Sequence, residues 1–474
     1  MRSFISIAAV AVVTFPFVNA VPNPQKLEAS YYSPEQVVET DVVIIGAGGA
    51  GCYSAIQLKD AGKRVVVIES KDRAGGHTET FIDPETNRPI DFGVKLYHDE
   101  PLVHQWFARF GLSTAPTSLS RANAQNIDFR TGRVLQGLPA ANQAAIGAAI
   151  QRYAAVISQW PQLDAGFYLP DPIPEDLLLP FGQFAQKYNI SDAVQTIFLL
   201  TSAFGDLAEI PTVQVIRTFS LSLVKTMQNF QTSSVMDNSL LFQRLTDELL
   251  ADNSLLLSST VIKTARVSKT DGRVRVLVQT PQGPRLVIAK KILITAPPTP
   301  DILAPLDTSG DELKLFTQFT SVNYFTTIVK NAFPGRSVVN LALDRPFAIP
   351  QMPAILNIEP TANPTYNQIF YGTKFGQSIT LDQAKAAILA DINRYRAANG
   401  ITGPDPEIIV ASAHNPFNLM VGPEATRNGF YKKLYGLQGK RNTFWASATF
   451  RAHDSSALWA YISRSVLPGL LASL

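Results

Sequence analysis

The stretch TDVVIIGAGGAG, residues 40–51, decides the fold. Its first half is a short, continuous apolar run, which is typical of a parallel strand buried on both faces. Its second half has the spacing G-x-G-x-x-G, with glycines at positions 46, 48 and 51. A helical pattern over 51–62 and a second apolar run over 65–68 follow, and Glu69 comes directly after that run. This order of strand, glycine turn, helix, strand and acid predicts a Rossmann-like unit that binds a dinucleotide.

Each part of this unit has a physical reason. Gly46 permits the tight turn, Gly48 lets the backbone approach a pyrophosphate, and Gly51 lets the helix pack closely on the strand. Ala47 belongs to the same predicted phosphate-binding turn. The helix N-terminus then directs free N–H groups and the positive end of its dipole at the phosphates. Glu69 is placed to accept hydrogen bonds from two ribose hydroxyls.

The composition excludes several classes of protein. A chain of 474 residues that is 46% hydrophobic and 17% charged is neither disordered, nor a coiled coil, nor a collagen. Its length predicts two or three structural units. The net charge of +3 is spread along the chain, so we expect no nucleic-acid partner. Cys52 is the only cysteine, which excludes an internal disulfide and a cysteine zinc site; the scattered histidines show no zinc spacing either, so we expect no metal.

The first twenty residues have the pattern of a cleavable signal peptide. Arg2 gives the positive charge, residues 4–18 form the apolar run, and Ala20 is the small residue before the expected cleavage point. The run is shorter than the about 20 residues that a transmembrane span needs, and no later run is long enough. We therefore expect no transmembrane span and a secreted or secretory-lumen protein, with a retained anchor as the alternative. Asn189-Ile190-Ser191 is a glycosylation motif, although a plain surface loop explains it nearly as well.

The sequence after Glu69 indicates which dinucleotide is bound. Residues 69–77, ESKDRAGGH, resemble the extended fingerprint of the flavin amine-oxidase superfamily, acid-x-x-x-Arg-x-Gly-Gly-Arg. NAD-binding units normally lack the Gly-Gly extension, so the resemblance implies FAD. It also implies that Ser70, Lys71, Gly76 and His77 lie at the cofactor, with His77 in the place of the usual arginine. For Lys71, and for Arg73 in the same loop, a solvated surface position is the alternative.

The resemblance continues in three later patches. Residues 90–94, IDFGV, look like the family's Asp-x-Gly strand, which implies that the backbone of Val94 and Lys95 passes beside the isoalloxazine. A helix expected over 239–252 leads to Val261, whose counterpart in the family presents its backbone to the adenine. Residues 292–298, ILITAPP, resemble the strand that returns to the flavin domain.

The last patch lies near the end of the chain. Residues 443–448 occupy the place of the family's Phe-Ala-Gly-Glu motif, and Ala448 replaces its glutamate, so the ribityl chain needs another partner. A closing helix over about 454–467 would direct its N-terminus at the flavin N1–C2 edge. Residues 91–99 and 106–110 look more particularly like a fungal branch typified by β-cyclopiazonate dehydrogenase, whose members act in secondary-metabolite pathways.

These patches predict an α/β fold of two parts. A Rossmann-like (GR2-type) FAD-binding domain is assembled from the discontinuous segments 36–99, 236–308 and 431–474. The insertions 100–235 and 309–430 form an α+β substrate domain. We expect the substrate pocket at the interface of the two domains.

The resemblance implies that a substrate C–H bond lies over flavin N5 and gives up a hydride, while a neighbouring group takes the proton. Lys95 and His98 are the candidate catalytic residues. Lys95 could stabilise the anionic reduced flavin or merely bind solvent, and His98 could transfer a proton or be structural. We expect molecular oxygen to take the electrons. Cys52 is expected to pack beneath the pyrophosphate rather than to react.

The sequence leaves several functions open. The first is dehydrogenation or oxidation, including oxidative cyclisation, of a small apolar metabolite. The alternatives are a double-bond isomerase of a polyunsaturated or lipid-like substrate, an amine or amino-acid oxidase, and a non-catalytic escort protein. In amine oxidases of the family a lysine commonly follows the Thr-x-Pro strand, whereas Leu303 stands there in this chain and the next lysine is Lys314. We therefore expect a larger, mostly apolar substrate.

Overall fold

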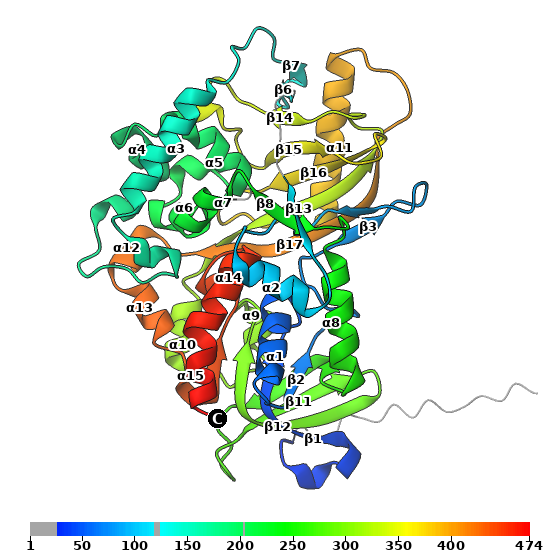
Figure 1. Ribbon diagram of the computed structural model, residues 1–474, viewed down its shortest axis with the longest axis vertical. Helices are drawn as coiled ribbons and strands as arrows, with labels where there is room; N and C mark the ends of the chain where they lie inside the picture. Colours follow the sequence, from blue (N-terminus) through cyan, green and yellow to red (C-terminus); the bar gives the residue numbers. More distant parts are fainter. Residues whose placement is uncertain (1–25, 118–123, 202–203) are drawn as a thin grey trace, which may run out of the picture.

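Two seven-stranded sheets carry the fold, one in the lower half and one in the upper half of Figure 1. The structure is a computed structural model that describes residues 26–117, 124–201 and 204–474. The predicted signal peptide, residues 1–20, therefore lies outside the described residues. In the described part of the chain, no helix combines the length and the apolar character that crossing a membrane requires.

The lower sheet is built around the strand that the sequence predicted first. Its strands are β1 (Val37–Ile45), β2 (Val65–Ile68), β9 (Leu255–Leu256), β10 (Thr260–Ala265), β11 (Val274–Thr280), β12 (Gly283–Ile294) and β18 (Thr443–Trp445). The order is β10-β11-β12-β1-β2-β9, with β18 paired to the end of β12. β1 runs parallel to both β12 and β2, and Val42, Val43 and Ile44 are fully buried. This confirms the predicted parallel strand that is buried on both faces.

Helices pack on this sheet where the apolar pattern predicted them. α1 (Gly49–Asp60) follows β1 directly, and α8 (Ser239–Ala251) buries Leu241, Leu245 and Leu249. The remaining elements of this half are β3 (Thr80–Ile82), β4 (Pro89–Asp91), α2 (Pro101–Arg109), α9 (Pro300–Leu303), α10 (Gly310–Phe316), α14 (Ser455–Tyr461) and α15 (Leu467–Ala472). A π-helical turn over Ile462–Val466 joins α14 to α15, so the predicted closing helix is present with an irregular centre.

The upper sheet is mostly antiparallel. Its strands are β6 (Gln125–Asp128), β7 (Arg133–Val134), β13 (Thr320–Lys330), β14 (Val338–Asn340), β15 (Ala354–Pro360), β16 (Tyr366–Gly372) and β17 (Glu407–Met420). The order is β17-β13-β16-β15-β14-β6-β7, and only the β14–β6 pair among these described strands is parallel. α11 (Leu381–Ala398) buries Ala384, Ile388 and Ile392 in the core beside this sheet. β17 lies at one edge of the sheet, on the side of the lower half (Figure 1).

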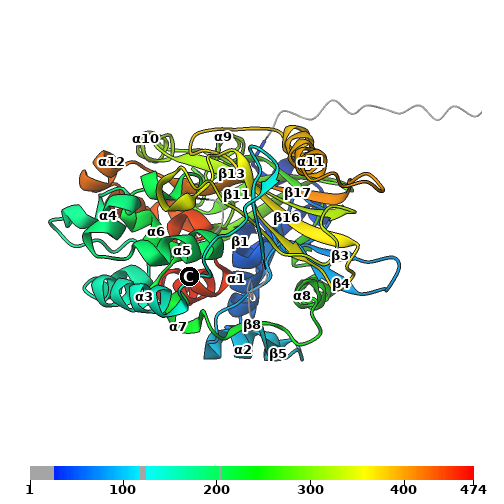
Figure 2. The ribbon, with the colours of Figure 1, turned by 90° about the horizontal axis from the view of Figure 1, so that it is seen from above.

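A group of helices lies beside the upper sheet (Figure 2). They are α3 (Gln143–Ile157), α4 (Phe181–Lys187), α5 (Val194–Thr201), α6 (Thr212–Thr218), α7 (Leu221–Thr226) and α12 (Pro423–Arg427). α13 (Phe430–Tyr435) follows α12 and lies next to α10 in Figure 1. A small ladder of β5 (Thr114–Thr117) and β8 (Phe230–Ser233) accompanies them. α3 is shorter than the helix predicted over 140–160, because the Asn142 side chain accepts a hydrogen bond from the Ala145 N–H and caps the helix there.

The prediction of an α/β fold built from discontinuous segments is confirmed. The strands of the lower sheet come from residues 37–68, 255–294 and 443–445, which are far apart in the sequence. The limits assigned to the two domains remain a prediction.

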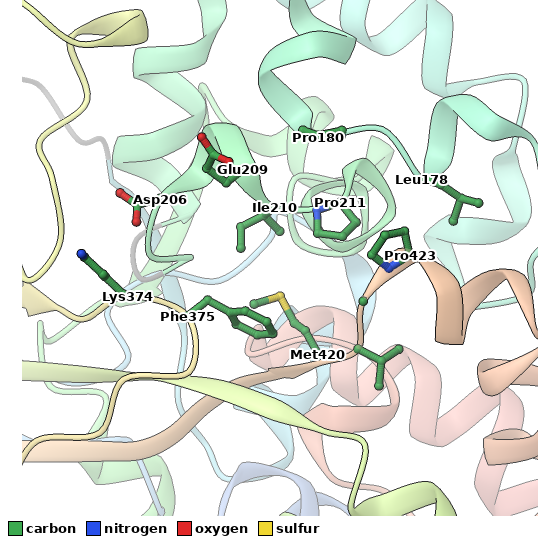
Figure 3. Close-up of a pocket in the computed structure, with 12 residues that line it drawn as sticks. Leu178, Pro180, Asp206, Glu209, Ile210, Pro211, Lys374, Phe375, Met420 and Pro423 are labelled. Carbon is green, nitrogen blue, oxygen red and sulfur yellow. The ribbon is translucent and has the colours of Figure 1, made fainter.

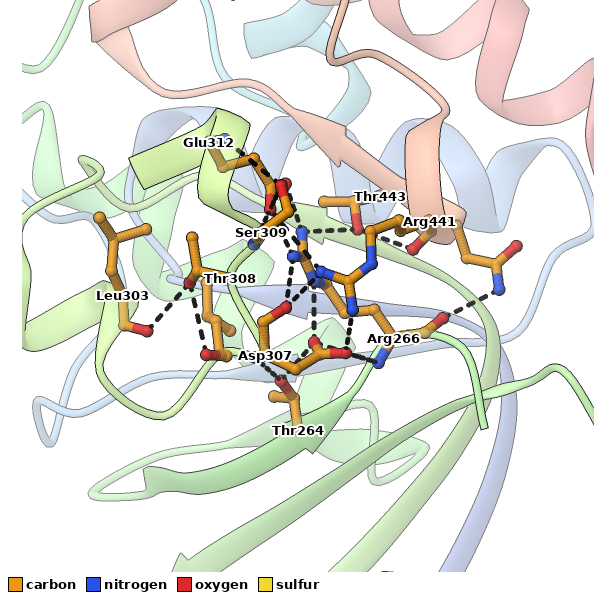
Figure 4. A network of polar contacts seen from close by, with 11 residues as sticks. Thr264, Arg266, Leu303, Asp307, Thr308, Ser309, Glu312, Arg441 and Thr443 are labelled. Carbon is orange, nitrogen blue, oxygen red and sulfur yellow. Dashed lines mark hydrogen bonds and ion pairs between the residues drawn. The ribbon is translucent and has the colours of Figure 1, made fainter. Parts of the chain in front are cut away.

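A buried ion-pair network fixes the segment between β12 and β13 to the lower sheet (Figure 4). Arg266 has a fully buried side chain and donates to both carboxylate oxygens of Glu312 at 2.7 Å. Its Nε atom also donates to Asp307 at 3.0 Å, and Asp307 accepts a further hydrogen bond from Arg441. Burial alone would raise the pKa of Glu312, but the hydrogen bonds from Arg266 lower it below its usual value. The network therefore holds a charged glutamate in the interior.

We predict that Glu312→Gln lowers the free energy of unfolding by about 3–5 kcal/mol, because Arg266 loses a charged partner while it stays buried. The matched control is Glu424→Gln, which removes a carboxylate from an exposed ion pair with Arg427 and should leave the stability almost unchanged. Urea denaturation of both variants measures the difference. Equal effects of the two substitutions would contradict the prediction.

Candidate active site

The glycine turn at the end of β1 is tied to the end of β2 by a carboxylate. The Ala47 N–H donates to Glu69 Oε2 at 2.7 Å, and the Lys71 N–H donates to Oε1 at 2.8 Å. The Ser70 hydroxyl is 3.3 Å from the same Oε1 atom. A carboxylate has about four acceptor positions, so Glu69 keeps capacity for a ribose hydroxyl. The side chains of Ser70 and Lys71 are themselves exposed.

Two backbone stretches meet at Gly48 and Gly76. Gly48 bridges to Gly75, and a Cβ atom added to Gly76 would lie 2.9 Å from the Gly48 Cα atom. A Cβ atom on Gly48 itself would meet nothing closer than 3.8 Å. Gly48 is also the N-cap of α1 and has no side chain to cap it, so the first N–H groups of the helix stay available. This backbone cradle fits the pyrophosphate of FAD.

Arg73 shapes the loop that follows this cradle. Its guanidinium donates to the carbonyl oxygens of Gly76 and Thr78 at 3.1 Å and to Glu79 at 2.7 Å. The sequence left two interpretations of Arg73, a solvated side chain or a cofactor contact. The geometry adds a third, because the side chain holds its own loop in place. Cys52 lies beneath the turn, fully buried, and its thiol donates to the Ala47 carbonyl at 3.1 Å. Burial raises the pKa of this thiol to about 12, which agrees with the predicted packing role.

The segment around Ala448 offers hydroxyl groups in place of the missing glutamate. Ala448 is partly buried, and the hydroxyls of its neighbours Ser447 and Thr449 are buried without any hydrogen-bond partner among the described residues. Buried hydroxyls normally have partners, so these two are suited to a bound polar chain such as the ribityl group. Val94 donates its N–H to the His77 carbonyl at 3.1 Å, and Val261 lies on β10 opposite Val278. The cofactor contacts expected of these residues remain a prediction.

Five aromatic and histidine rings gather between the flavin loop and the upper sheet. We call them the ring cluster: His77, Tyr324, His414, Phe417 and His453. His77 and His414 stack with ring centroids 4.0 Å apart and planes within 12°, and Phe417 and His453 are also 4.0 Å apart. His77 and His453 come from the predicted flavin segments, whereas the other three come from β13 and β17.

The two histidines from the flavin segments are electrically neutral. Burial lowers the pKa of His77 well below its usual value, and the nearby His414 and His453 lower it further. Burial, followed by the charge of Arg217 and by His414, lowers the pKa of His453 to about 3. Glu79 faces His414, with 3.5 Å between its Oε2 atom and Nε2. The ring cluster is thus an aromatic, largely uncharged surface with one carboxylate at its edge.

The two candidate catalytic residues lie in ion pairs. Lys95 Nζ donates to Glu359 on β15 and to Gln368 on β16, the latter at 2.9 Å. His98 is buried and its Nε2 atom is 2.9 Å from Asp454 Oδ2, at the N-cap of α14. These contacts join the segment 94–98 to the upper sheet and to the closing helix. The catalytic roles of Lys95 and His98 remain a prediction.

The sequence did not indicate that His414, Phe417 and Tyr324 belong to the site. His414 was one of several scattered histidines, and the only local signal was the alternating pattern of β13. The structure adds that the β13–β17 pairing shifts register between Val322 and Tyr324, opposite Phe417 and His414. Such bulges re-aim side chains and are frequent beside active sites.

A cavity of about 340 Å³ opens between the helical group and the end of β17 (Figure 3). Leu178, Ile210, Phe375 and Met420 give it mostly apolar walls. Asp206, Glu209 and Lys374 lie together at one side of it. Among the described residues, no three His, Cys, Asp or Glu side chains are grouped so that they could hold a metal ion.

A family model described as "Flavin containing amine oxidoreductase" matches residues 50–433. The chain belongs to this family. It is 35% identical to the FAD-dependent oxidoreductase oblC of Cochliobolus heterostrophus, with 96% of each chain covered. It is 30% identical to the beta-cyclopiazonate dehydrogenase of Aspergillus oryzae, over 90% of this chain and 91% of the relative. The protein is therefore an FAD-dependent oxidoreductase, as the resemblance implied.

Solved structures show the same fold at low identity. A CLA-producing fatty acid isomerase from P. acnes has a TM-score of 0.71 at 18% identity, covering 90% of this chain and 98% of the other. Putrescine oxidase with bound putrescine has a TM-score of 0.61 at 15% identity, with 92% and 98% covered. At these identities the likeness establishes the fold alone.

We predict that Gly48→Val abolishes FAD binding and leaves the fold intact. The backbone at Gly48 has an ordinary extended conformation and the added side chain meets little protein, but it fills the space where the pyrophosphate approaches. Flavin absorbance and fluorescence titration measure the binding, and circular dichroism checks the fold. Gly147→Val, on an exposed turn of α3 with open space around it, is the control and should bind FAD normally. A yellow Gly48→Val protein would contradict the assignment.

We predict that the stabilisation by His98 disappears at alkaline pH. Burial would lower the pKa of His98, but the charge of Asp454 and its hydrogen bond raise it to about 10, from 6.5 in the unfolded chain. The contribution is therefore complete below pH 6.5 and is lost as the pH rises towards 10. The destabilisation caused by His98→Gln, measured by urea denaturation, should shrink over that range. His104→Gln, at an exposed histidine paired with Asp99, should have a small effect at every pH. A constant difference between wild type and His98→Gln would refute the assigned charge.

Proposed function

We propose that this protein dehydrogenates a mostly apolar small molecule of secondary metabolism, in some substrates with ring closure, and that molecular oxygen reoxidises the flavin. The relatives named FAD-dependent oxidoreductase and beta-cyclopiazonate dehydrogenase support this class of substrate. The observation that carries the proposal is the ring cluster, because an aromatic surface adjoins the flavin loop and burial lowers the pKa values of its His77 and His453. Such a surface offers a stacking face to an apolar, conjugated body.

The residue at position 303 supports the same conclusion. Leu303 is buried in the core of the lower half, only 7% exposed, where amine oxidases of the family commonly have a lysine. The stretch that starts the closing helix is polar, and its Asp454 is already occupied by His98 and by the Ala457 N–H. Amine oxidases of the family often place an aromatic residue at the start of this helix to frame the amine, and this chain has residues 453–456, HDSS, there. Neither position therefore provides the features of a small-amine site.

Each group of residues has a definite task in this proposal. Bound FAD supplies the chemistry, since its N5 atom accepts a hydride from a C–H bond. The glycine cradle holds the pyrophosphate, and Ser447 and Thr449 offer hydroxyls to the ribityl chain. The ring cluster orients the substrate and keeps water away from it. The ion pair of His98 and Asp454 fixes the start of α14, whose dipole favours negative charge nearby.

Location in the secretory pathway is part of the proposal. It is supported by the signal pattern of residues 1–20 and by the glycosylation motif, in which Asn189 and Ser191 are exposed.

We predict that benzylamine, putrescine and L-amino acids neither bleach the flavin under anaerobic conditions nor give peroxide in air. Apolar pathway intermediates should bleach it, and the product should be two hydrogen masses lighter than its substrate. A product of unchanged mass would favour a double-bond isomerase instead. Robust turnover of any of the amines would overturn the proposed substrate class.

A further inference from the structure

Arg217, at the end of α6, is a buried cation without a counter-ion. The residue is 2% exposed, and its guanidinium makes two hydrogen bonds, to Asn418 Oδ1 at 3.1 Å and to the Leu419 carbonyl at 3.4 Å. Its Nε atom is buried and has no partner among the described residues. Among the described residues, Arg217 forms no ion pair with a carboxylate. Three of its five donor positions are thus unused.

The other buried arginines have carboxylates nearby. Arg266 is equally buried and is neutralised by Glu312 and Asp307. Arg451 is 1% exposed and donates to the carbonyls of Arg217 and Asp164. Like Arg217, it has an Nε atom without a partner among the described residues and a pKa that burial lowers, but the carboxylates of Asp164 and Asp454 oppose that lowering. Around Arg217 only the hydroxyls of Tyr431 and Tyr435 oppose the effect of burial, and Arg451 adds a second positive charge.

Arg217 remains charged at neutral pH in spite of this. Burial, and then repulsion by Arg451, lower its pKa from 12.5 to about 10. Its guanidinium carbon is 5.4 Å from the centre of the Phe167 ring, which holds the charge in place without neutralising it. An uncompensated buried charge is strongly unfavourable, and proteins keep one where a ligand supplies the opposite charge.

The hydrogen-bond partners of Arg217 lie between the ring cluster and the cavity. Its contacts are Asn418 and Leu419, and these residues link Phe417 of the ring cluster to Met420 in the cavity wall. The cavity wall also contains Ile210 and Pro211, which immediately precede α6 (Figure 3). The charge of Arg217 acts on His453, whose ring is 4.0 Å from Phe417. The guanidinium is therefore bonded to the stretch of β17 that joins the ring cluster to the cavity wall, while Arg217 itself is not among the residues that line the cavity.

We propose that Arg217 binds an anionic oxygen group of the substrate, a carboxylate or an enolate, while the apolar body of the molecule lies against the ring cluster and the cavity. This inference rests on the proposed function and adds that the substrate is an organic anion. A planar guanidinium with free N–H groups binds two oxygens of such a group at once. The free protein already bears the cost of burying an unpaired positive charge. A bound oxyanion compensates that charge, whereas a neutral analogue of the same shape does not, so the anion binds more tightly.

The experiment uses the FAD-loaded protein and two probes of similar shape, benzoate and neutral benzamide. Benzoate should shift the flavin absorbance and raise the melting temperature of the wild type, whereas benzamide should bind at least about tenfold more weakly. Arg217→Gln should keep FAD, lose the preference for benzoate, and melt no lower than the wild type without probe, because the variant removes an unpaired buried charge. Arg217→Lys keeps the charge without the fork and should bind benzoate more weakly. Arg427→Gln, at an exposed arginine, is the control and should behave as the wild type.

Equal responses of the wild type to the two probes would overturn the proposal, and so would unchanged benzoate binding by Arg217→Gln. If Arg217 only stabilised the fold, Arg217→Gln would have a lower melting temperature than the wild type and the same preference between the two probes. If Arg217→Gln fails to fold, the comparison of probes in the wild type and in Arg217→Lys decides. None of these measurements needs turnover, so a failed search for a dehydrogenated product and a failed anion preference are separate results.

Discussion

The contact between Gly51 and Gly46 determines how the rest of the structure is arranged. A Cβ atom on Gly51 would lie 1.9 Å from the Gly46 carbonyl oxygen, so only glycine lets α1 approach β1 this closely. The Thr295 hydroxyl, at the end of β12, donates to the carbonyls of Ile45 and Gly46 and holds the turn from the other side. Because α1 is fixed there, its free N–H groups face the loop that contains Gly76. The cofactor cradle follows from this packing constraint.

A second layer of contacts relates the cradle to the substrate side. Lys95 joins the segment after β4 to β15 and β16, and His98 joins the next residues to Asp454 at the start of α14. These charged pairs are partly or wholly buried, and charged hydrogen bonds of this kind are directional. They set the position of the ring cluster relative to the lower sheet. Lys95 and His98, whose catalytic roles remain a prediction, thus also connect these parts of the structure.

The flavin half could be predicted from the sequence, because its signals are local. Residues 40–69 contain a buried strand, a glycine turn, a helix and an acid in order, and each part is recognisable within its own window. Ala448 could likewise be seen to replace a glutamate, yet only the structure shows the unpartnered hydroxyls on either side of it. The ring cluster could not be predicted, because it brings together residues that are far apart in the sequence, such as His77 and His414. Arg217 gives no sequence signal at all, since an arginine in the last turn of a helix is normally solvated.

The pairing of β18 with β12 has a consequence for how the protein is made. Residues 443–445 add the strand beside Ile292–Ile294, and Ser447 and Thr449 come just after it. During synthesis, β1 and α1 leave the ribosome first. The strands of the upper half are translated before β18 and the hydroxyls of Ser447 and Thr449, because these lie near the end of the sequence. A chain interrupted before residue 443 therefore contains the glycine cradle but lacks both β18 and the two hydroxyls.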